Sequence, residues 1–372
     1  MNRGKYIIIG FIVMCFNSLY QYSWNALEPL IRMGFNVSLV QIALGFTLFS
    51  IFSSGFQPIG GHFADKTGPK IIGLISALLS ALGFLGTYFS PNIYIFYIFW
   101  SLGSIGEGIL YGIAANLAIK WFKDKMGFAT GLVSMGFGLG SAIANPFISM
   151  ANNYKTVTLL IGLTEVILLP ILLWMSDYPP KLSGEAPKQV ILSAKFWLIY
   201  ISFVGSVTPL TVLSSELPIL GKNLPQHEII ILISILPLLS GISRPFLGYI
   251  ADKLGILRTT LLLNIIILIG SSLLLLNQIP ISTVLIGFSG GSLITLYFSV
   301  SGEIFGTRFS TVNSGILYTG KALGGALGSS VFALLYTISF QLSIIYTIIL
   351  SLVGVLTLLT LIIYPTKQIR KT

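Results

Sequence analysis

The sequence predicts an all-α membrane protein with twelve transmembrane helices in two six-helix bundles. Three features lead to this fold class: the composition, the recurrence of long apolar runs, and a motif repeated at half the chain length. Of the 372 residues, 54% are hydrophobic and only 9% are charged, whereas a soluble domain usually carries about 25% charged residues. No polar stretch is long enough to fold by itself, which excludes a soluble enzyme with one membrane anchor.

Apolar runs of about twenty residues, each long enough to cross a ~30 Å hydrocarbon layer, follow one another along the chain. The first run continues to about Leu27 without a small-residue cleavage site, so it is expected to remain as a span. The shortest separation between two runs falls at 278–280. The expected spans are 5–27, 38–63, 70–89, 93–119, 127–150, 155–176, 195–219, 227–251, 258–277, 280–304, 311–337 and 341–364.

The lysines and arginines predict the orientation. With the N-terminus in the cytoplasm, the outer segments hold only Arg32, Lys155 and Lys222. This bias predicts a multi-pass protein of the cell (plasma) membrane with both termini cytoplasmic. The net charge of +10 is thereby explained without a nucleic-acid partner. The cytoplasmic cations are Arg3, Lys5, Lys66, Lys70, Lys120, Lys123, Lys125, Lys181, Lys188, Lys195, Lys253, Arg258, Arg308, Lys367, Arg370 and Lys371.

A motif, G-x-x-A-D-K-x-G, occurs at 61–68 and again at 248–255, an offset of 187 in a chain whose half-length is 186. Each copy closes an even-numbered span on the cytoplasmic side. The repeat predicts two six-helix halves, 1–178 and 195–372, joined by a cytoplasmic linker, 179–194. The first glycine of each copy allows helices to approach closely, and Asp65 and Asp252 can each cap a helix or pair with a cation.

This motif resembles that of the major facilitator superfamily, although Pro69-Lys70 replaces the usual basic pair. The stretches KWFKDKMGFATGLVSMGFG (120–138), SRPFLG (243–248), GILYTGK (315–321) and QYSW (21–24) resemble the oxalate/formate antiporter family of carboxylate transporters. Monocarboxylate transporters share parts of the first stretch. The resemblance implies two bundles around a central cavity that opens alternately to each side. Contacts between the halves would then gate the cavity, with Asp65, Asp252, Glu303 and Arg308 as candidates.

Two cations fall inside apolar spans. Arg244 lies eight residues before Asp252, or ~12 Å inside, and Lys321 lies ~15 Å from the cytoplasmic side. An unpaired cation at that depth costs at least ~2.5–3.5 kcal/mol, so each needs an anionic partner or a wet cavity. Small and polar residues at helical spacing around both favour a cavity, in which the two cations would hold a small organic anion from both ends. The resemblance also assigns an Arg in span eight and a Lys in span eleven to substrate carboxylates.

The alternative is that each cation pairs with a buried carboxylate, for which Glu107 and Glu165 are the candidates. Glu107, midway along span four, is unexpected in an oxalate exchanger. If it faces the cavity, the site charge falls from +2 to +1, which suits a monocarboxylate or proton coupling. A purely structural Glu107, hydrogen-bonded between helices, remains open, and Glu165 is expected to be structural.

Three tyrosines deep in spans one, four and eleven, Tyr22, Tyr111 and Tyr318, are expected to line the cavity, because a phenol can donate a hydrogen bond to a carboxylate. Tyr297 is a further candidate. Ordinary packing is the alternative for each of them.

The sequence shows no motif that indicates an enzyme. It lacks the G-x-x-x-x-G-K-[ST] loop of ATP hydrolysis, and one cysteine (Cys15) with two histidines (His62 and His227) predicts no disulfide, metal site or cofactor. The expected function is secondary active transport of a small carboxylate by a protein that works as a monomer in the lipid bilayer. A proton-coupled monocarboxylate symporter, a drug or sugar carrier and a ligand sensor remain as alternatives.

Overall fold

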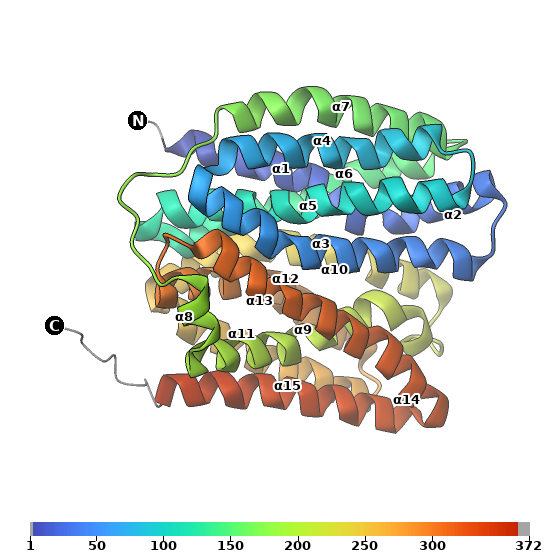
Figure 1. Cartoon of the computed structure of the whole chain (residues 1–372). Helices are drawn as coiled ribbons and strands as arrows, with labels where there is room; N and C mark the ends of the chain where they lie inside the picture. The colour runs from blue at the N-terminus through green and yellow to red at the C-terminus, as the bar shows by residue number, and fades with distance from the viewer. Residues whose placement is uncertain (1–2, 364–372) are drawn as a thin grey trace.

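The computed structural model describes residues 3–363, and its regular secondary structure over that range is helical. The helices run roughly side by side in two groups, α1–α7 above and α9–α15 below (Figure 1). Three of the predicted cytoplasmic cations lie outside the described residues: Lys367, Arg370 and Lys371.

The described residues of the first half form seven α-helices. They are α1 (Gly4–Gln21), α2 (Trp24–Phe35), α3 (Leu39–Thr67), α4 (Pro69–Phe89), α5 (Ile93–Trp121), α6 (Met126–Ser149) and α7 (Tyr154–Trp174), with a 3-10 turn at Lys123–Lys125. The linker holds α8 (Pro187–Ile191). The second half contains α9 (Ala194–Leu220), α10 (Gln226–Leu254), α11 (Ile256–Leu275), α12 (Ile279–Phe305), α13 (Ser310–Ala326), a π-helical segment (Leu327–Val331), α14 (Phe332–Ile338) and α15 (Phe340–Ile363).

The helices reproduce the twelve expected spans to within a few residues, except at the first. The span expected at 5–27 bends by 50° after α1 and continues through α2 to Phe35, so Arg32 lies in the last helical turn and not in a loop. The helix ends where Asn36 takes a left-handed conformation, a common C-terminal stop. Within the described residues, eight helices are individually long and apolar enough to cross a membrane, and the bent α1–α2 pair makes a ninth.

Local sequence explains where several helices begin and turn. Asn92 and Asn153 cap α5 and α7 with their side chains, as expected for asparagine at a helix start. In the two motif copies, Gly68 and Gly255 have φ angles of 89° and 94°. Only glycine adopts these angles readily, so each motif can reverse the chain within one or two residues.

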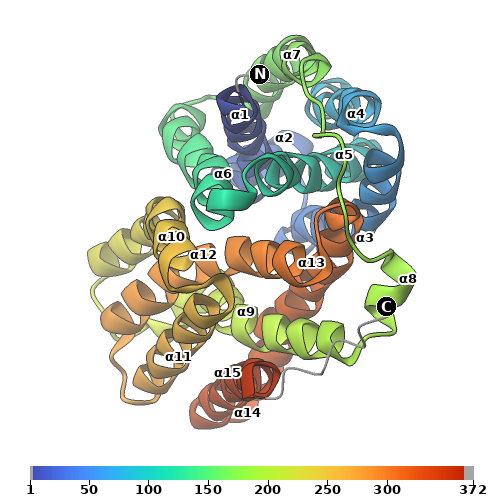
Figure 2. The ribbon, with the colours of Figure 1, turned by 90° about the vertical axis from the view of Figure 1, so that its left-hand side faces the viewer.

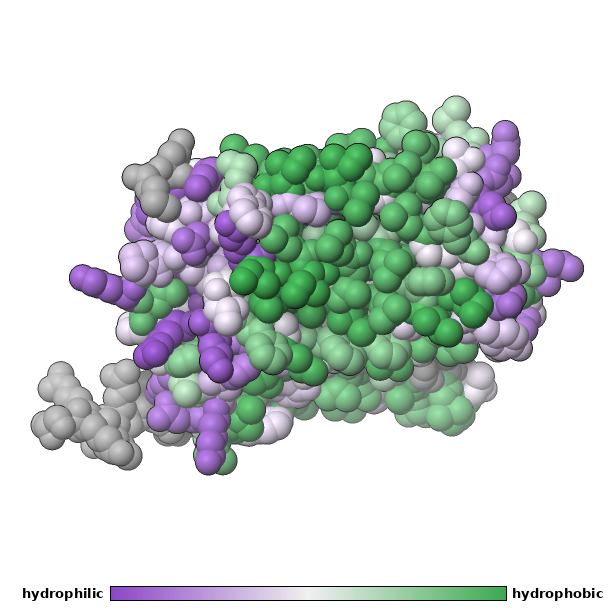
Figure 3. Space-filling view, turned by 45° about the horizontal axis from the view of Figure 1, so that its top comes forward, coloured by the Kyte–Doolittle hydropathy of each residue, from purple (hydrophilic) through white to green (hydrophobic). Residues whose placement is uncertain are grey.

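The outer surface has a broad apolar band between two polar ends (Figure 3). Helix α1 begins and α15 ends at the same end of the molecule, which is also the end of the α3–α4 turn (Figure 1). Viewed from this end, the two halves lie one against the other, with α3 beside α13 and α6 beside α10 (Figure 2).

Glycines let the halves meet at this end, called here the motif end. A Cβ added at Gly127 of α6 would lie 2.5 Å from the carbonyl oxygen of Gly248 on α10. Likewise a Cβ at Gly61 of α3 would lie 2.6 Å from the carbonyl oxygen of Thr311 on α13. These contacts leave no space for a side chain, so the glycines hold the backbones of the two halves together.

Candidate functional site

Arg244 is 1% exposed and lies where α10 of the second half meets α6 of the first. Its Nε donates to the Ser240 carbonyl (3.1 Å), and its Nη1 donates to the Ser134 carbonyl across the interface (2.8 Å). Both acceptors are neutral, so they orient the guanidinium without cancelling its charge. A guanidinium has five N–H donors, which leaves donors for a further acceptor.

Lys321 also reaches across the interface, from α13 toward α1. Its Nζ donates to the Gln21 side-chain oxygen (2.7 Å) and to the Tyr318 hydroxyl (2.8 Å). These acceptors are again neutral. Among the described residues, neither Lys321 nor Arg244 forms an ion pair within 4.0 Å.

One aromatic ring lies close to both cations. The Arg244 Cζ and the Lys321 Nζ each lie 5.7 Å from the ring centre of Phe137 on α6. Cations are attracted to the face of such a ring. The structure therefore brings together the two cations that the sequence predicts inside apolar spans. They are 77 positions apart in the sequence, and α11 and α12 lie between them along the chain.

The expected tyrosines surround this point. Tyr111 of α5 stacks on Tyr318 of α13 with ring centres 5.0 Å apart, and Tyr111 and Tyr22 each meet Phe137 edge-on at 5.3 Å. Tyr111 also interacts with the Arg244 guanidinium. Three of the four predicted tyrosines thus lie at the site, and Phe298 closes it from α12 through contacts with Tyr111 and Tyr318.

Tyr297 lies elsewhere. It is 0% exposed, and its hydroxyl is hydrogen-bonded to Ser202 and Asn264 inside the second half, beside Phe203. Successive residues on a helix point about 100° apart, so Phe298 faces the site and Tyr297 faces the bundle interior. The structure does not bring Tyr297 to the cations.

Glu107 is buried between α5 and α3, where it accepts a hydrogen bond from Ser53 (2.6 Å). It is close enough to Lys321 for the two charges to attract each other, though no direct ion pair joins them. Glu165 lies apart from the cations, between α7 and α4. One of its oxygens accepts a hydrogen bond from Ser80 (2.9 Å), and the other has no partner among the described residues. Glu107 is thus the carboxylate that adjoins the cations.

At the motif end, Asp65 connects three helices. One carboxylate oxygen lies 2.9 Å from Lys120 Nζ on α5, and the other accepts a hydrogen bond from the Val312 backbone N–H in the first turn of α13 (2.9 Å). Lys120 in turn donates to the carbonyls of Thr307 and Arg308 (2.6 and 3.0 Å). The capping and the pairing considered for Asp65 both occur.

Asp252 repeats the capping in the opposite direction. From α10 of the second half it accepts hydrogen bonds from the backbone N–H groups of Gly127 and Phe128 at the start of α6 (2.7 and 2.8 Å). At the motif end, the Arg308 carbonyl accepts the hydrogen bond from Lys120, while the exposed Arg308 guanidinium lies over the Phe309 ring. Glu303 is exposed, and Asp252 repels it electrostatically.

Sequence reasoning missed Phe137 and Gln21, and it counted Lys120 as a loop cation. Lys120 is 2% exposed and lies in the last helical turn of α5. A signal was present, because Gly112, Asn116 and Lys120 follow at intervals of four and mark one helix face. That face meets α13, where the Asn116 side chain bonds Ser310 and Ser314. Phe137 carried no comparable signal among 25 phenylalanines.

Comparisons with known proteins agree with this architecture. A 46% identical protein of Thermoproteus tenax, named "Uncharacterized 38 kDa protein in 23S RNA operon", covers 90% of this chain and 89% of its own length. The oxalate:formate antiporter of Oxalobacter formigenes is 29% identical over 89% of this chain and 85% of its own. The crystal structure of the transporter FucP in the outward conformation superimposes with a TM-score of 0.77 at 14% identity, covering 95% of this chain and 98% of FucP.

The family model of the Major Facilitator Superfamily matches residues 7–224 and 199–372. The two matches together extend over nearly the whole chain and overlap at 199–224, mostly within α9. The chain therefore belongs to the Major Facilitator Superfamily of membrane transporters and is not an enzyme.

Proposed function

We propose that this transporter carries a small organic anion with one or two carboxylates, bound between Arg244 and Lys321. The observation that carries the proposal is the convergence of both cations on Phe137, at 5.7 Å each, with only neutral hydrogen-bond acceptors around them. Charges in a low-dielectric interior attract a counter-ion strongly. A carboxylate can accept two N–H groups of Arg244 side by side, and Lys321 can reach its other end.

Anion exchange is the preferred mode of transport. One relative, 29% identical, is named as an oxalate:formate antiporter, which supports exchange. The charges also support it, because two uncompensated cations are costly to carry through a closed, dry intermediate without a bound anion. A drug or sugar carrier of the same fold would have little use for both cations.

We place the motif end in the cytoplasm, because the described basic residues of the loops gather there. The halves are held together at this end by Asp65, Asp252 and the glycine contacts. Under this orientation, the structure corresponds to a state closed to the cytoplasm, and transport requires these contacts to open.

Uptake of labelled oxalate, formate and lactate into vesicles reconstituted with the purified protein and preloaded with unlabelled acid tests the substrate class. Arg244→Ala and Lys321→Ala should abolish uptake, whereas Lys155→Ala, an exposed cation outside the site, should not change it. Arg244→Lys keeps the positive charge but loses the paired N–H donors of the guanidinium, so it should retain weak anion binding. Anion uptake at the wild-type rate by both alanine variants, with all proteins eluting as folded monodisperse particles, would refute the proposal.

A proton-coupled symporter is the second candidate, and one observation favours it. Glu107 is buried next to Lys321 and, among the described residues, accepts one side-chain hydrogen bond, from Ser53. A proton taken up by Glu107 would enter the site together with the substrate anion, so net charge movement would stay small.

A further inference from the structure

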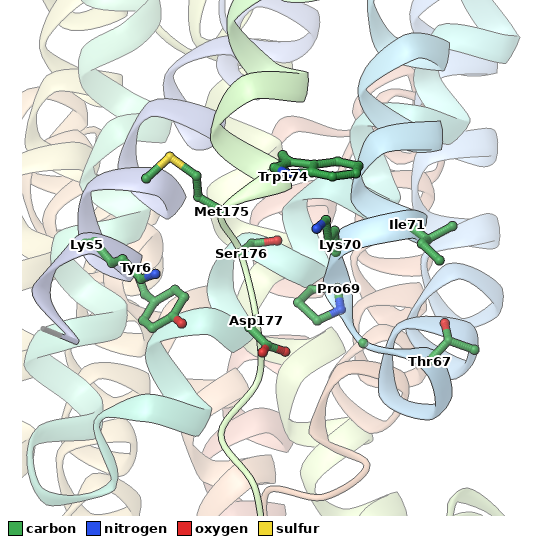
Figure 4. Close-up of a pocket in the computed structure, with 11 residues that line it drawn as sticks. Lys5, Tyr6, Thr67, Pro69, Lys70, Ile71, Trp174, Met175, Ser176 and Asp177 are labelled. Carbon is green, nitrogen blue, oxygen red and sulfur yellow. The ribbon is translucent and has the colours of Figure 1, made fainter. Parts of the chain in front are cut away.

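A pocket of about 450 Å³ lies at the motif end on the outer side of the first half, away from the cations of the substrate site. Its wall comes from the start of α1, the α3–α4 turn and the end of α7 (Figure 4). This volume lies within the range of small-molecule pockets. The substrate site does not use any residue of this pocket.

The described residues give the pocket a net positive charge. Lys5 and Lys70 both line it, and among the described residues neither forms an ion pair. Helix α4 begins here at Pro69, and its N-cap, Gly68, supplies no capping side chain. The free N–H groups of a 21-residue helix add a partial positive charge at this point. Asp177 is the one acidic residue among the described residues of the wall. Its carboxylate accepts the Tyr178 N–H (2.8 Å) and interacts electrostatically with the Tyr6 hydroxyl.

A buried hydroxyl also points to a ligand. Tyr6 is 0% exposed and lines the pocket, and among the described residues its hydroxyl has no hydrogen-bond partner. A buried donor left unpaired costs about 1–3 kcal/mol. An acceptor bound in the pocket would remove this cost.

The rim of the pocket is apolar and exposed. Trp174, Ile71 and Met175 are 63%, 59% and 51% exposed, and the Lys70 Nζ lies 3.4 Å from the centre of the Trp174 ring. Tryptophan at a helix end marks the boundary between hydrocarbon and headgroups. A ligand here would meet cations and N–H donors at one end and hydrocarbon-facing side chains at the other.

The second half shows that the fold does not require Lys70 or Trp174. At the motif offset of 187 they correspond to Leu257 and Leu361, whereas Lys5, the second residue of α1, has a counterpart in Lys195, the second residue of α9. We propose that the pocket binds the phosphate of an anionic phospholipid from the leaflet at the motif end. Lys5, Lys70, the α4 N-terminus and the Tyr6 hydroxyl would hold the phosphate, and the acyl chains would pass over Trp174 and Ile71.

Quenching of tryptophan fluorescence by brominated lipids tests the proposal. The full-length protein is placed in phosphatidylcholine vesicles that contain brominated phosphatidylglycerol or brominated phosphatidylcholine, and the part of the quenching that Trp174→Phe removes reports the pocket. Brominated phosphatidylglycerol should quench the Trp174 fluorescence at a mole fraction about tenfold lower than brominated phosphatidylcholine requires. The Lys5→Gln/Lys70→Gln variant should lose the preference, each single variant should lose part of it, and Lys253→Gln at the turn of the second half should keep it.

Tyr6→Phe should weaken the preference severalfold without affecting folding, because it removes only the unpaired hydroxyl. Equal quenching by the two lipids, or a preference that survives the double lysine substitution, would overturn the proposal. Inorganic phosphate added at constant ionic strength separates the two sources of the phosphate group. If it abolishes the preference, the pocket takes soluble phosphate and the lipid assignment is wrong.

Discussion

Asp65 and Lys120 form an ion pair of 2.9 Å whose side chains are 1% and 0% exposed. Its repeat counterpart is incomplete. Asp252 corresponds to Asp65 at the offset of 187, but among the described residues Asp252 forms no ion pair, so the second copy has the cap without the cation. The two motif copies therefore hold the halves together by unequal means, and one contains a buried charge that depends on its partner.

Replacing Asp65 should open the motif end. Asp65→Asn leaves Lys120 as an unpaired buried cation, and breaking a buried pair from one side costs about 3–5 kcal/mol. The closed state should lose population and turnover should slow, while the substrate affinity changes little. Spin labels at positions 66 and 253, in a Cys15→Ser background, should report a longer distance between the two halves.

Asp252→Asn is the matched control for this prediction and should shift the distance less, because no buried cation loses its partner. The double variant Asp65→Asn/Lys120→Met should restore part of the closed population. Normal turnover with weakened binding in Asp65→Asn would instead place Asp65 at the substrate site.

A methyl group added at the contact between α3 and α13 should open the motif end, as Asp65→Asn should. In Gly61→Ala the new Cβ would lie 2.6 Å from the Thr311 carbonyl oxygen, which is backbone and cannot move aside alone. Gly55 on the same helix has no atom within 4 Å of the corresponding position. Gly61→Ala should slow exchange several-fold and lengthen the spin-label distance, whereas Gly55→Ala should do neither.

Substrate binding should become stronger as the pH falls if Glu107 takes part in the site. A proton on Glu107 removes the negative charge beside Lys321, so the site charge rises from about +1 to +2 and attracts an anion more strongly. The concentration for half-maximal uptake should fall on acidification in the wild type and become independent of pH in Glu107→Gln. Glu165→Gln, which changes the other buried carboxylate, should retain the wild-type pH dependence.

The same variants distinguish exchange from symport. Uptake that an imposed pH gradient drives without internal substrate, and that Glu107→Gln abolishes, would indicate symport. Uptake that strictly requires internal anion and ignores the gradient would leave an exchanger.

Phe137 should contribute to anion transport although it cannot bind an anion directly. Its ring contacts both cations, and a desolvated cation–π contact is worth about 2 kcal/mol. Phe137→Ala should raise the half-saturating anion concentration by about tenfold or more, because the two cations lose their common support. Phe147→Ala, at an exposed position of the same helix, should leave uptake unchanged. An unaltered uptake curve for Phe137→Ala would remove Phe137 from the site.

The sequence by itself determined the membrane-spanning helices, the twofold repeat and the positions of Arg244 and Lys321 within apolar helices. These properties depend on the length of each apolar run and on positions along one helix, which can be counted locally. The repeat also placed Asp65 and Asp252 at contacts between the halves, because a motif at half-length spacing marks equivalent turns.

Only the tertiary structure decided which side chains meet. The rotation of each helix about its axis places Phe298 at the cations and turns Tyr297 into the second half, although the two residues are adjacent. The approach of α6 to α10 puts Phe137 beside Arg244, and the approach of α3 to α5 puts Lys120 beside Asp65. Such contacts depend on how helices far apart in the chain pack at glycine positions, and helical periodicity alone does not specify that packing.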